Sequence, residues 1–137
     1  MKTFLDSSAL AKRYIDEKGS ERVEEVLGET DSLGLSVLSI PELVSAFCRK
    51  KREGDLTGDQ YRLAKQSLLT DTADADIINL VPAVISRTIL LLEKEPLRAL
   101  DALHVGSALE WKADLFVTAD RQQGDAASHS GLKVEVV

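Results

Sequence analysis

The sequence predicts one α/β domain over residues 1–137, with a central, mainly parallel sheet of about four to five strands and helices on both faces. Short apolar runs alternate with longer segments of helical periodicity, which is the pattern of a parallel sheet. A chain of 137 residues suits a single core. Its 44% hydrophobic and 29% charged residues are typical of an ordered globular domain. No repeat, linker or low-complexity segment interrupts the pattern.

The first half of the chain begins with an apolar run, Met1–Leu5, which predicts a strand ended by Asp6. Ser7 or Ser8 can cap the helix expected at Ala9–Asp16. Further along we expect a helix opened by Ser20, a strand at Leu33–Leu38, and helices at Ser39–Lys51 and Thr57–Thr70.

The second half opens with the polar segment Asp71–Asp76, which predicts a loop. Prolines are favoured in the first turn of a helix, so Pro82 and Pro96 mark two helix starts. The predicted elements are a strand at Ile77–Val81, helices at Pro82–Lys94 and Leu97–Trp111, a strand at Leu115–Thr118, a helix at Arg121–His129 and a strand at Lys133–Val137.

The formal charge of -6 and the pI near 4.9 argue against a protein that coats nucleic acid by neutralising its phosphates. They are compatible with an acidic pocket in which bound metal ions supply positive charge. Cys48 is the only cysteine, so no internal disulfide can form. Asp6 interrupts any signal-peptide core, and no apolar stretch is long enough to span a bilayer. We therefore expect a cytoplasmic protein without a membrane partner.

Four acids stand at a predicted strand end or helix start, and each has a purely structural alternative. Asp6 and Asp120 can each cap a helix. Glu42 fits a capping box, because Ser39-Ile40-Pro41-Glu42 has the S-x-x-E form. Asp101 lies near a helix start, where a negative charge is favourable, and Arg98 is one turn away.

Taken together, these acids predict a functional site. In a parallel sheet the crevice lies beyond the carboxyl ends of the strands, which is where Asp6 and Asp120 follow their strands. Asp101 is embedded in an apolar helix, and burying it is costly without a partner. A divalent cation is such a partner, and hard carboxylate oxygens suit Mg²⁺ or Mn²⁺.

Four sequence motifs, in order, resemble those of PIN-domain ribonucleases, and the resemblance covers essentially the whole chain. The motifs are FLDSSAL at 4–10, SIPELVSA at 39–46, LRALDALH at 97–104 and FVTAD at 116–120. The short single-domain form is similar to the VapC toxins of bacterial and archaeal toxin–antitoxin pairs.

The resemblance implies a ribonuclease in which Asp6, Glu42, Asp101 and Asp120 are the catalytic acids and hold one or two Mg²⁺ or Mn²⁺ ions. It implies in-line attack of water on phosphorus, leaving a 5′-phosphate and a 3′-hydroxyl. Ser8 and Thr118 match positions where a hydroxyl can orient a ligand, and Arg98 can meet the RNA backbone. The implied partners are RNA, a small antitoxin and a second copy of the chain. The apolar helix Pro82–Leu92 is a candidate surface for the second copy, and burial of this helix within the monomer is the simpler alternative.

Two further features have more than one interpretation. The basic run Arg49–Arg52 ends a helix, where positive charges interact favourably with the helix dipole. The preferred interpretation is a solvated helix end, and contact with RNA phosphates is the second. His104 lies one turn from Asp101 and is expected to be packed or hydrogen-bonded beside the site.

Other functions remain open at this point. A phosphatase of the haloacid-dehalogenase type also begins with a strand and an aspartate, but it needs a second aspartate where this chain has Ser8. A phospho-acceptor signalling domain would need paired acids near the first strand. A non-catalytic PIN-like module that binds RNA or protein has no need of all four acids. An RNA-processing PIN nuclease outside a toxin–antitoxin pair is the remaining alternative.

Overall fold

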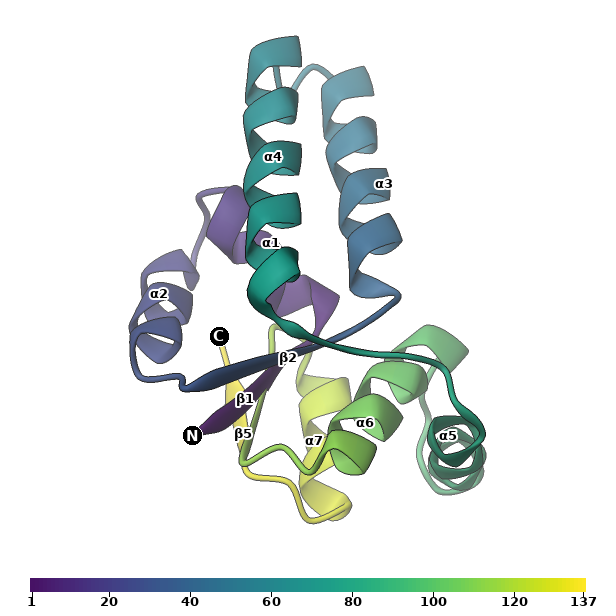
Figure 1. Cartoon of the computed structure of the whole chain (residues 1–137). Coiled ribbons are helices and arrows are strands. Elements are labelled where there is room, and N and C mark those ends of the chain that lie inside the picture. The colour runs from purple at the N-terminus through teal and green to yellow at the C-terminus, as the bar shows by residue number, and fades with distance from the viewer.

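The computed structural model describes residues 1–137 as seven helices around a five-stranded sheet (Figure 1). The first half of the chain forms β1 (Lys2–Leu5), α1 (Ser7–Tyr14), α2 (Ser20–Gly28), β2 (Ser32–Ser36), α3 (Ser39–Arg52) and α4 (Gly58–Asp74). The second half forms β3 (Asp76–Ile78), α5 (Pro82–Lys94), α6 (Ala99–Trp111), β4 (Leu115–Thr118), α7 (Arg121–His129) and β5 (Val134–Val136).

The strands are all parallel and lie in the order β3-β2-β1-β4-β5. The chain starts at the central strand, builds outward through β2 and β3, and then returns to place β4 on the other side of β1. The order therefore reverses between β1 and β4, where Leu5 pairs with Val117. Such a reversal opens a crevice at the carboxyl ends of the two strands, which is the usual ligand site of a doubly wound sheet.

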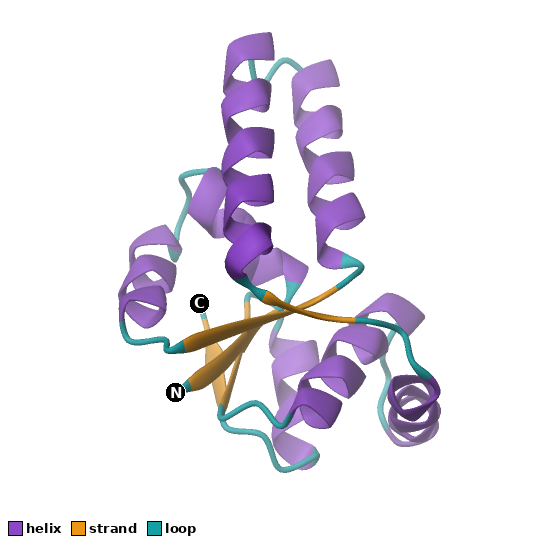
Figure 2. Ribbon diagram, in the orientation of Figure 1, coloured by secondary structure: helices purple, strands orange, loops and turns teal.

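Alternating side chains of the strands build a core on each face of the sheet. Leu5 and Val117 belong to a cluster shared with α1 to α4, whereas Phe4 and Phe116 point the other way and pack against α5, α6 and α7. The predicted α/β fold, with helices on both faces, is confirmed (Figure 2).

The expected loop at Asp71–Asp76 is wrong. Helix α4 continues to Asp74, and Asp76 already belongs to β3. Distant partners support the last turn of α4: the Asp71 carboxylate accepts hydrogen bonds from Arg13 Nε and Tyr14 Oη, both at 2.7 Å. These partners come from α1, so the local sequence did not reveal them.

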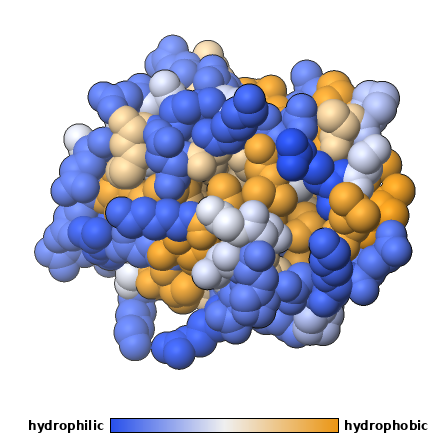
Figure 3. Space-filling model, turned by 90° about the horizontal axis from the view of Figure 1, so that it is seen from below, coloured by the Kyte–Doolittle hydropathy of each residue, from blue (hydrophilic) through white to orange (hydrophobic).

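Helix α5 packs on α6 through the buried side chains of Val84, Thr88 and Leu91. Its opposite face is apolar and exposed, with Ile89 and Leu90 each more than half accessible. Apolar atoms also reach the surface in the space-filling view from below (Figure 3). No helix in the structure has both the length and the apolar character needed to cross a membrane.

Candidate active site

Asp6 is held rigidly at the end of β1. It is the N-cap of α1, as one of the two interpretations of the sequence predicted, because its Oδ1 accepts the Ala9 N–H at 2.9 Å. Ser7 and Ser8, the other candidates, lie inside the helix. The Ser8 hydroxyl donates to the carboxylate at 2.8 Å, and Thr118 Oγ1 donates to Oδ2 at 2.7 Å. Burial raises the pKa of Asp6 despite the opposing hydrogen bonds from Thr118, Ala9 and Ser8.

Ser8 and Thr118 also bind the backbone at the end of β4. Ser8 Oγ accepts the Ala119 N–H at 3.0 Å, and Thr118 Oγ1 accepts the Asp120 N–H at 3.0 Å. The two hydroxyls that the motifs singled out therefore connect the carboxyl ends of β1 and β4 through Asp6. This arrangement fixes both the position and the orientation of the Asp6 carboxylate.

The expected capping box of Ser39 and Glu42 is wrong. Helix α3 has Leu38 at its N-cap, so Ser39 is already inside the helix and the box spacing is lost. Glu42 is instead turned toward neighbouring elements. Its Oε1 accepts hydrogen bonds from Ser7 Oγ at 3.0 Å and from His104 Nε2 at 2.6 Å.

Glu42 is half-buried, and burial acts to raise its pKa. The hydrogen bond and the charge of His104, with the hydroxyl of Ser7, outweigh burial and lower the pKa below its ordinary value. The arrangement thus keeps Glu42 ionised.

His104 is buried on α6, with only 2% of its surface exposed, and it contacts the site as the sequence predicted. Its Nε2 lies 2.6 Å from Glu42 Oε1 and 3.3 Å from Ser7 Oγ. Its Nδ1 is buried and has no hydrogen-bond partner. We assign a proton to Nε2, because this places a donor on the Glu42 carboxylate.

Asp101 lies in the first turn of α6 and is partly buried. Burial raises its pKa, and the charges of Asp120 and Glu42 raise it further, whereas His104 and Arg98 act in the opposite direction. The fold therefore brings Asp120 and Glu42 close enough to Asp101 for their charges to act on its carboxylate. Arg98 is exposed beside Asp101 and makes no ion pair.

Asp120 is the N-cap of α7, as one interpretation of the sequence predicted. Its Oδ1 accepts the N–H groups of Gln122 and Gln123, at 2.9 and 3.4 Å. Capping one oxygen does not remove the negative charge that acts on Asp101.

Sequence reasoning missed Gln123. Its side chain is buried, and its Nε2 donates to the Asp101 carbonyl at 3.1 Å while its Oε1 lies 3.2 Å from Thr118 Oγ1. It connects the start of α6 to the end of β4. The available signal was its position three residues after Asp120, on the same face as the small residues Ala126 and Ala127, which are buried.

The donor set fits a hard divalent cation. Every charged donor among Glu42, Asp101 and Asp120 is a carboxylate oxygen. Burial and the charges of Asp120 and Glu42 raise the pKa of Asp101, and a bound cation would offset both effects. No three Asp, Glu, His or Cys side chains yet converge on one point at binding distance.

A family model described as the PIN domain matches residues 3–128. No curated protein matches the chain. Solved structures with a similar fold include VapBC2 from Rickettsia felis bound to a promoter DNA fragment. The two chains are 15% identical, the match covers 100% of this chain and 99% of the other, and the TM-score is 0.72. FitAcB from Neisseria gonorrhoeae has 15% identity, coverage of 96% and 95%, and a TM-score of 0.70. VapC20 from Mycobacterium tuberculosis has 12% identity, coverage of 95% for both chains, and a TM-score of 0.68.

The family model spans nearly the whole chain, and the overall architecture agrees with that of the solved structures. The chain belongs to the PIN domain family.

Proposed function

We propose that this protein is a divalent-metal-dependent endoribonuclease, and that it is the toxin of a toxin–antitoxin pair acting in the cytoplasm. The proposal is carried by one observation: four acids lie near one another at the carboxyl ends of β1 and β4, and the pKa of Asp101 is raised there. The acids are Asp6, which is buried, and Glu42, Asp101 and Asp120. PIN nucleases generally use divalent metals. One structure of similar fold, VapC20, is described as a toxin that cleaves the sarcin-ricin loop.

In this proposal Asp6, Glu42, Asp101 and Asp120 are the catalytic acids and together hold Mg²⁺ or Mn²⁺. When bound, the metal supplies Lewis-acid stabilisation of the charge that develops on the phosphate. Asp6 keeps its orientation through Ser8 and Thr118.

The neighbours of the acids have supporting roles. Ser7 and His104 hold Glu42 ionised and pointed into the cluster. The exposed Arg98 guanidinium, next to Asp101, is available for a phosphate oxygen of the RNA.

The proposed partners are a small antitoxin and a second copy of the chain. Two structures of similar fold support the antitoxin: one is described as a toxin–antitoxin complex from Klebsiella pneumoniae, and the other as VapBC-5 from Mycobacterium tuberculosis, a member of the VapBC family of toxin–antitoxin systems. For the second copy we propose the exposed face of α5 as the contact surface. This face carries a contiguous set of exposed apolar side chains, and such a patch is typical of a protein–protein interface. The side chains are Ile85, Ile89, Leu90 and Leu92.

The test is cleavage of total RNA with added Mg²⁺ or Mn²⁺ by the wild type, Asp101→Asn and Asp125→Asn. Asp125 is exposed on α7 and is the matched control for loss of one carboxylate. We expect cleavage by the wild type and Asp125→Asn only. Equal cleavage by all three would place the activity outside this site or in a contaminant.

A coexpression pull-down tests the partner. Recovery of a small protein that blocks cleavage supports the toxin assignment. Cleavage without any small partner would instead favour an RNA-processing PIN nuclease, and metal binding without cleavage of any RNA would favour a non-catalytic module.

A further inference from the structure

Two cavities flank α1, and only one of them touches the acid cluster. The larger, of about 770 Å³, lies among α1, α2 and α4, and its arginine, Arg13, is already paired with Glu24 and Asp71. The smaller, of about 570 Å³, lies between α1, α3 and the start of α6. Ser7, Ser8 and Glu42 form its end at the acids, so this cavity continues directly from the candidate active site.

The smaller cavity has only two charged side chains in its lining, Glu42 and Arg49. They lie seven residues apart on α3, or about 10 Å along the helix at 1.5 Å per residue. Arg49 is exposed and makes no ion pair, whereas Arg13, Arg22 and Arg87 each pair with an acid. Its guanidinium is therefore free to bind an anion near the acids.

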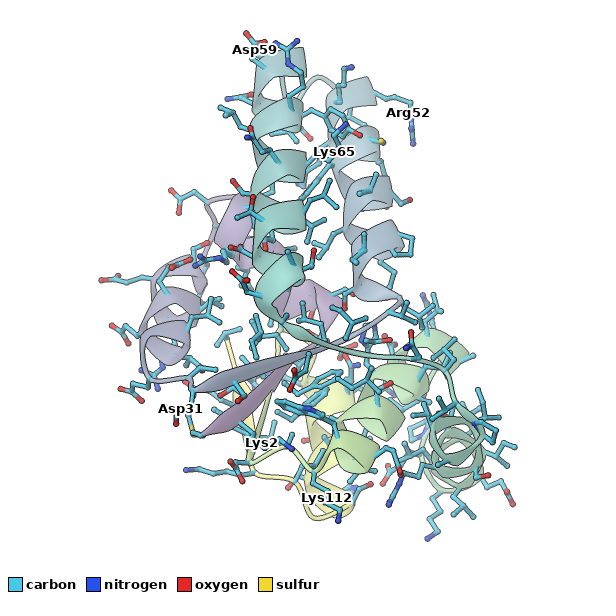
Figure 4. All side chains as sticks on the ribbon, viewed as in Figure 1. Lys2, Asp31, Arg52, Asp59, Lys65 and Lys112 are labelled. Carbon is cyan, nitrogen blue, oxygen red and sulfur yellow. The ribbon has the colours of Figure 1, made fainter.

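The structure separates Arg49 from the rest of the basic run that ends α3. Lys51 Nζ lies 5.4 Å from the Tyr61 ring centroid, on the side facing α4. Arg52 extends from the far end of the α3–α4 pair, away from the sheet (Figure 4). Neither lines the cavity. Arg49 is therefore the residue of the basic run to which the alternative interpretation, contact with RNA phosphates, applies.

The remaining wall of the cavity is apolar and includes Pro41 and Leu100. Leu100 is 47% exposed, although the next residue, Asp101, belongs to the acid cluster. Exposing the apolar side chain of a leucine to water is unfavourable, and packing it against the flat ring of a nucleotide base would remove that surface from water. A phosphate-binding arginine and an apolar wall in one cavity match the two chemical parts of a nucleotide.

We infer that this cavity is the subsite for the nucleotide next to the scissile phosphate of a single-stranded RNA. Arg49 binds the phosphate of that nucleotide, and its base lies against Leu100. The strand is single because a base within a duplex is stacked between its neighbours and cannot reach this wall. The volume is within the range of pockets that hold ligands of this size. The inference rests on the proposed ribonuclease function and names how its substrate is held.

The test measures binding of a fluorescently labelled, randomised single-stranded RNA pool by anisotropy, in an Asp101→Asn background that suppresses cleavage. Arg49→Gln is compared with Arg52→Gln, which removes the same charge from the same helix end. Arg49→Gln should raise Kd about tenfold and lower the slope of log Kd against log salt by about 0.7, the value for one phosphate contact to a single strand. Arg52→Gln should change neither quantity appreciably.

Leu100→Ser is compared with Leu69→Ser, which removes a leucine of similar exposure, 49%, from α4. Only Leu100→Ser should weaken RNA binding, by about five- to tenfold, because it removes the apolar contact with the base. Both leucines are exposed, so neither change threatens the fold. Equal effects of Arg49→Gln and Arg52→Gln, or no effect of either, would overturn the subsite.

Failure of the subsite and failure of the proposed function give different results. If the wild type cleaves RNA but the Arg49 and Leu100 variants bind the pool like their controls, the nuclease stands and the subsite falls. If the chain neither cleaves nor binds RNA, both fall. If Arg49→Gln impairs binding of a coexpressed small protein but not of RNA, this cavity is a protein-docking site and the inference is wrong.

Discussion

Replacing Asp101 by Asn should make the protein more stable than the wild type without metal and less stable than the wild type with metal. Without metal, the Asp101 charge is penalised by burial and by repulsion from Asp120 and Glu42, so its pKa is raised. A group with a raised pKa favours its protonated form in the fold. Its favourable contribution to stability is lost as pH rises through the folded pKa, so at neutral pH the ionised Asp101 destabilises the protein.

The magnitude is small because Asp101 is only partly buried. Solvent screening limits the relief to about 1 kcal/mol. Loss of a negative charge from the first turn of α6 opposes this by roughly 0.3–0.5 kcal/mol. We therefore expect Asp101→Asn to be more stable than the wild type by about 0.5 kcal/mol in the presence of EDTA.

Saturating Mg²⁺ or Mn²⁺ should make the wild type more stable than Asp101→Asn. A ligand that binds only the folded state stabilises it by about 2.7 kcal/mol at a hundredfold excess over Kd. The wild type should gain this amount, and Asp101→Asn much less, because it lacks one charged donor. The variant should then be the less stable protein.

Urea unfolding followed by the fluorescence of Trp111, the only tryptophan, measures both conditions. Asp125→Asn, which changes an exposed carboxylate of α7, should follow the wild type throughout. The reasoning would be refuted if Asp101→Asn were the less stable protein in EDTA, or if metal stabilised Asp101→Asn and the wild type equally.

Three further predictions follow from buried contacts. His104→Gln retains a donor near the position of Nε2 and should stay within about fivefold of wild-type metal affinity, whereas His104→Asn withdraws it and should lose about 10–100-fold in calorimetry. The pKa of Glu42 is lowered in the folded protein, so its contribution to stability is present above about pH 4.5 and is lost as the pH falls through the folded pKa. His104→Leu removes the partner that lowers this pKa. Urea unfolding at neutral and acidic pH should therefore show that the free energy of unfolding falls less on acidification in His104→Leu than in the wild type. Gly34→Ala places a methyl group 2.6 Å from the Trp111 ring and should destabilise the fold by about 1–3 kcal/mol, and a free energy of unfolding equal to that of the wild type would contradict this packing.

The sequence alone indicated most of the local structure. Apolar runs of strand length and helical periodicity predicted nearly every element, because these signals depend on residues that are close in the chain. Pro82 does begin α5, but Pro96 lies outside α6, which begins at Ala99. The positions of Asp6 after β1 and of Asp120 at the start of α7 were evident for the same reason. The order and spacing of the four motifs were sufficient to predict the PIN family, which the family model confirms.

Local signals failed where a distant partner competes with a nearby one. Ser39 and Glu42 have the spacing of a capping box, but Glu42 binds His104, 62 residues away, and Ser7 instead. The polar segment after Thr70 stays helical because Arg13 and Tyr14 hold it. In both cases a hydrogen bond formed only after folding outweighs the local preference.

The strand order, which no local pattern encodes, decided how the site is built. Because β4 returns to lie beside β1, Thr118 reaches Asp6, and the starts of α6 and α7 bring Asp101 and Asp120 near it. The sequence supplied the acids and their places at the ends of elements. Only the tertiary structure brought their charges close enough to shift a pKa, because electrostatic interaction depends on distance in space and not on separation along the chain.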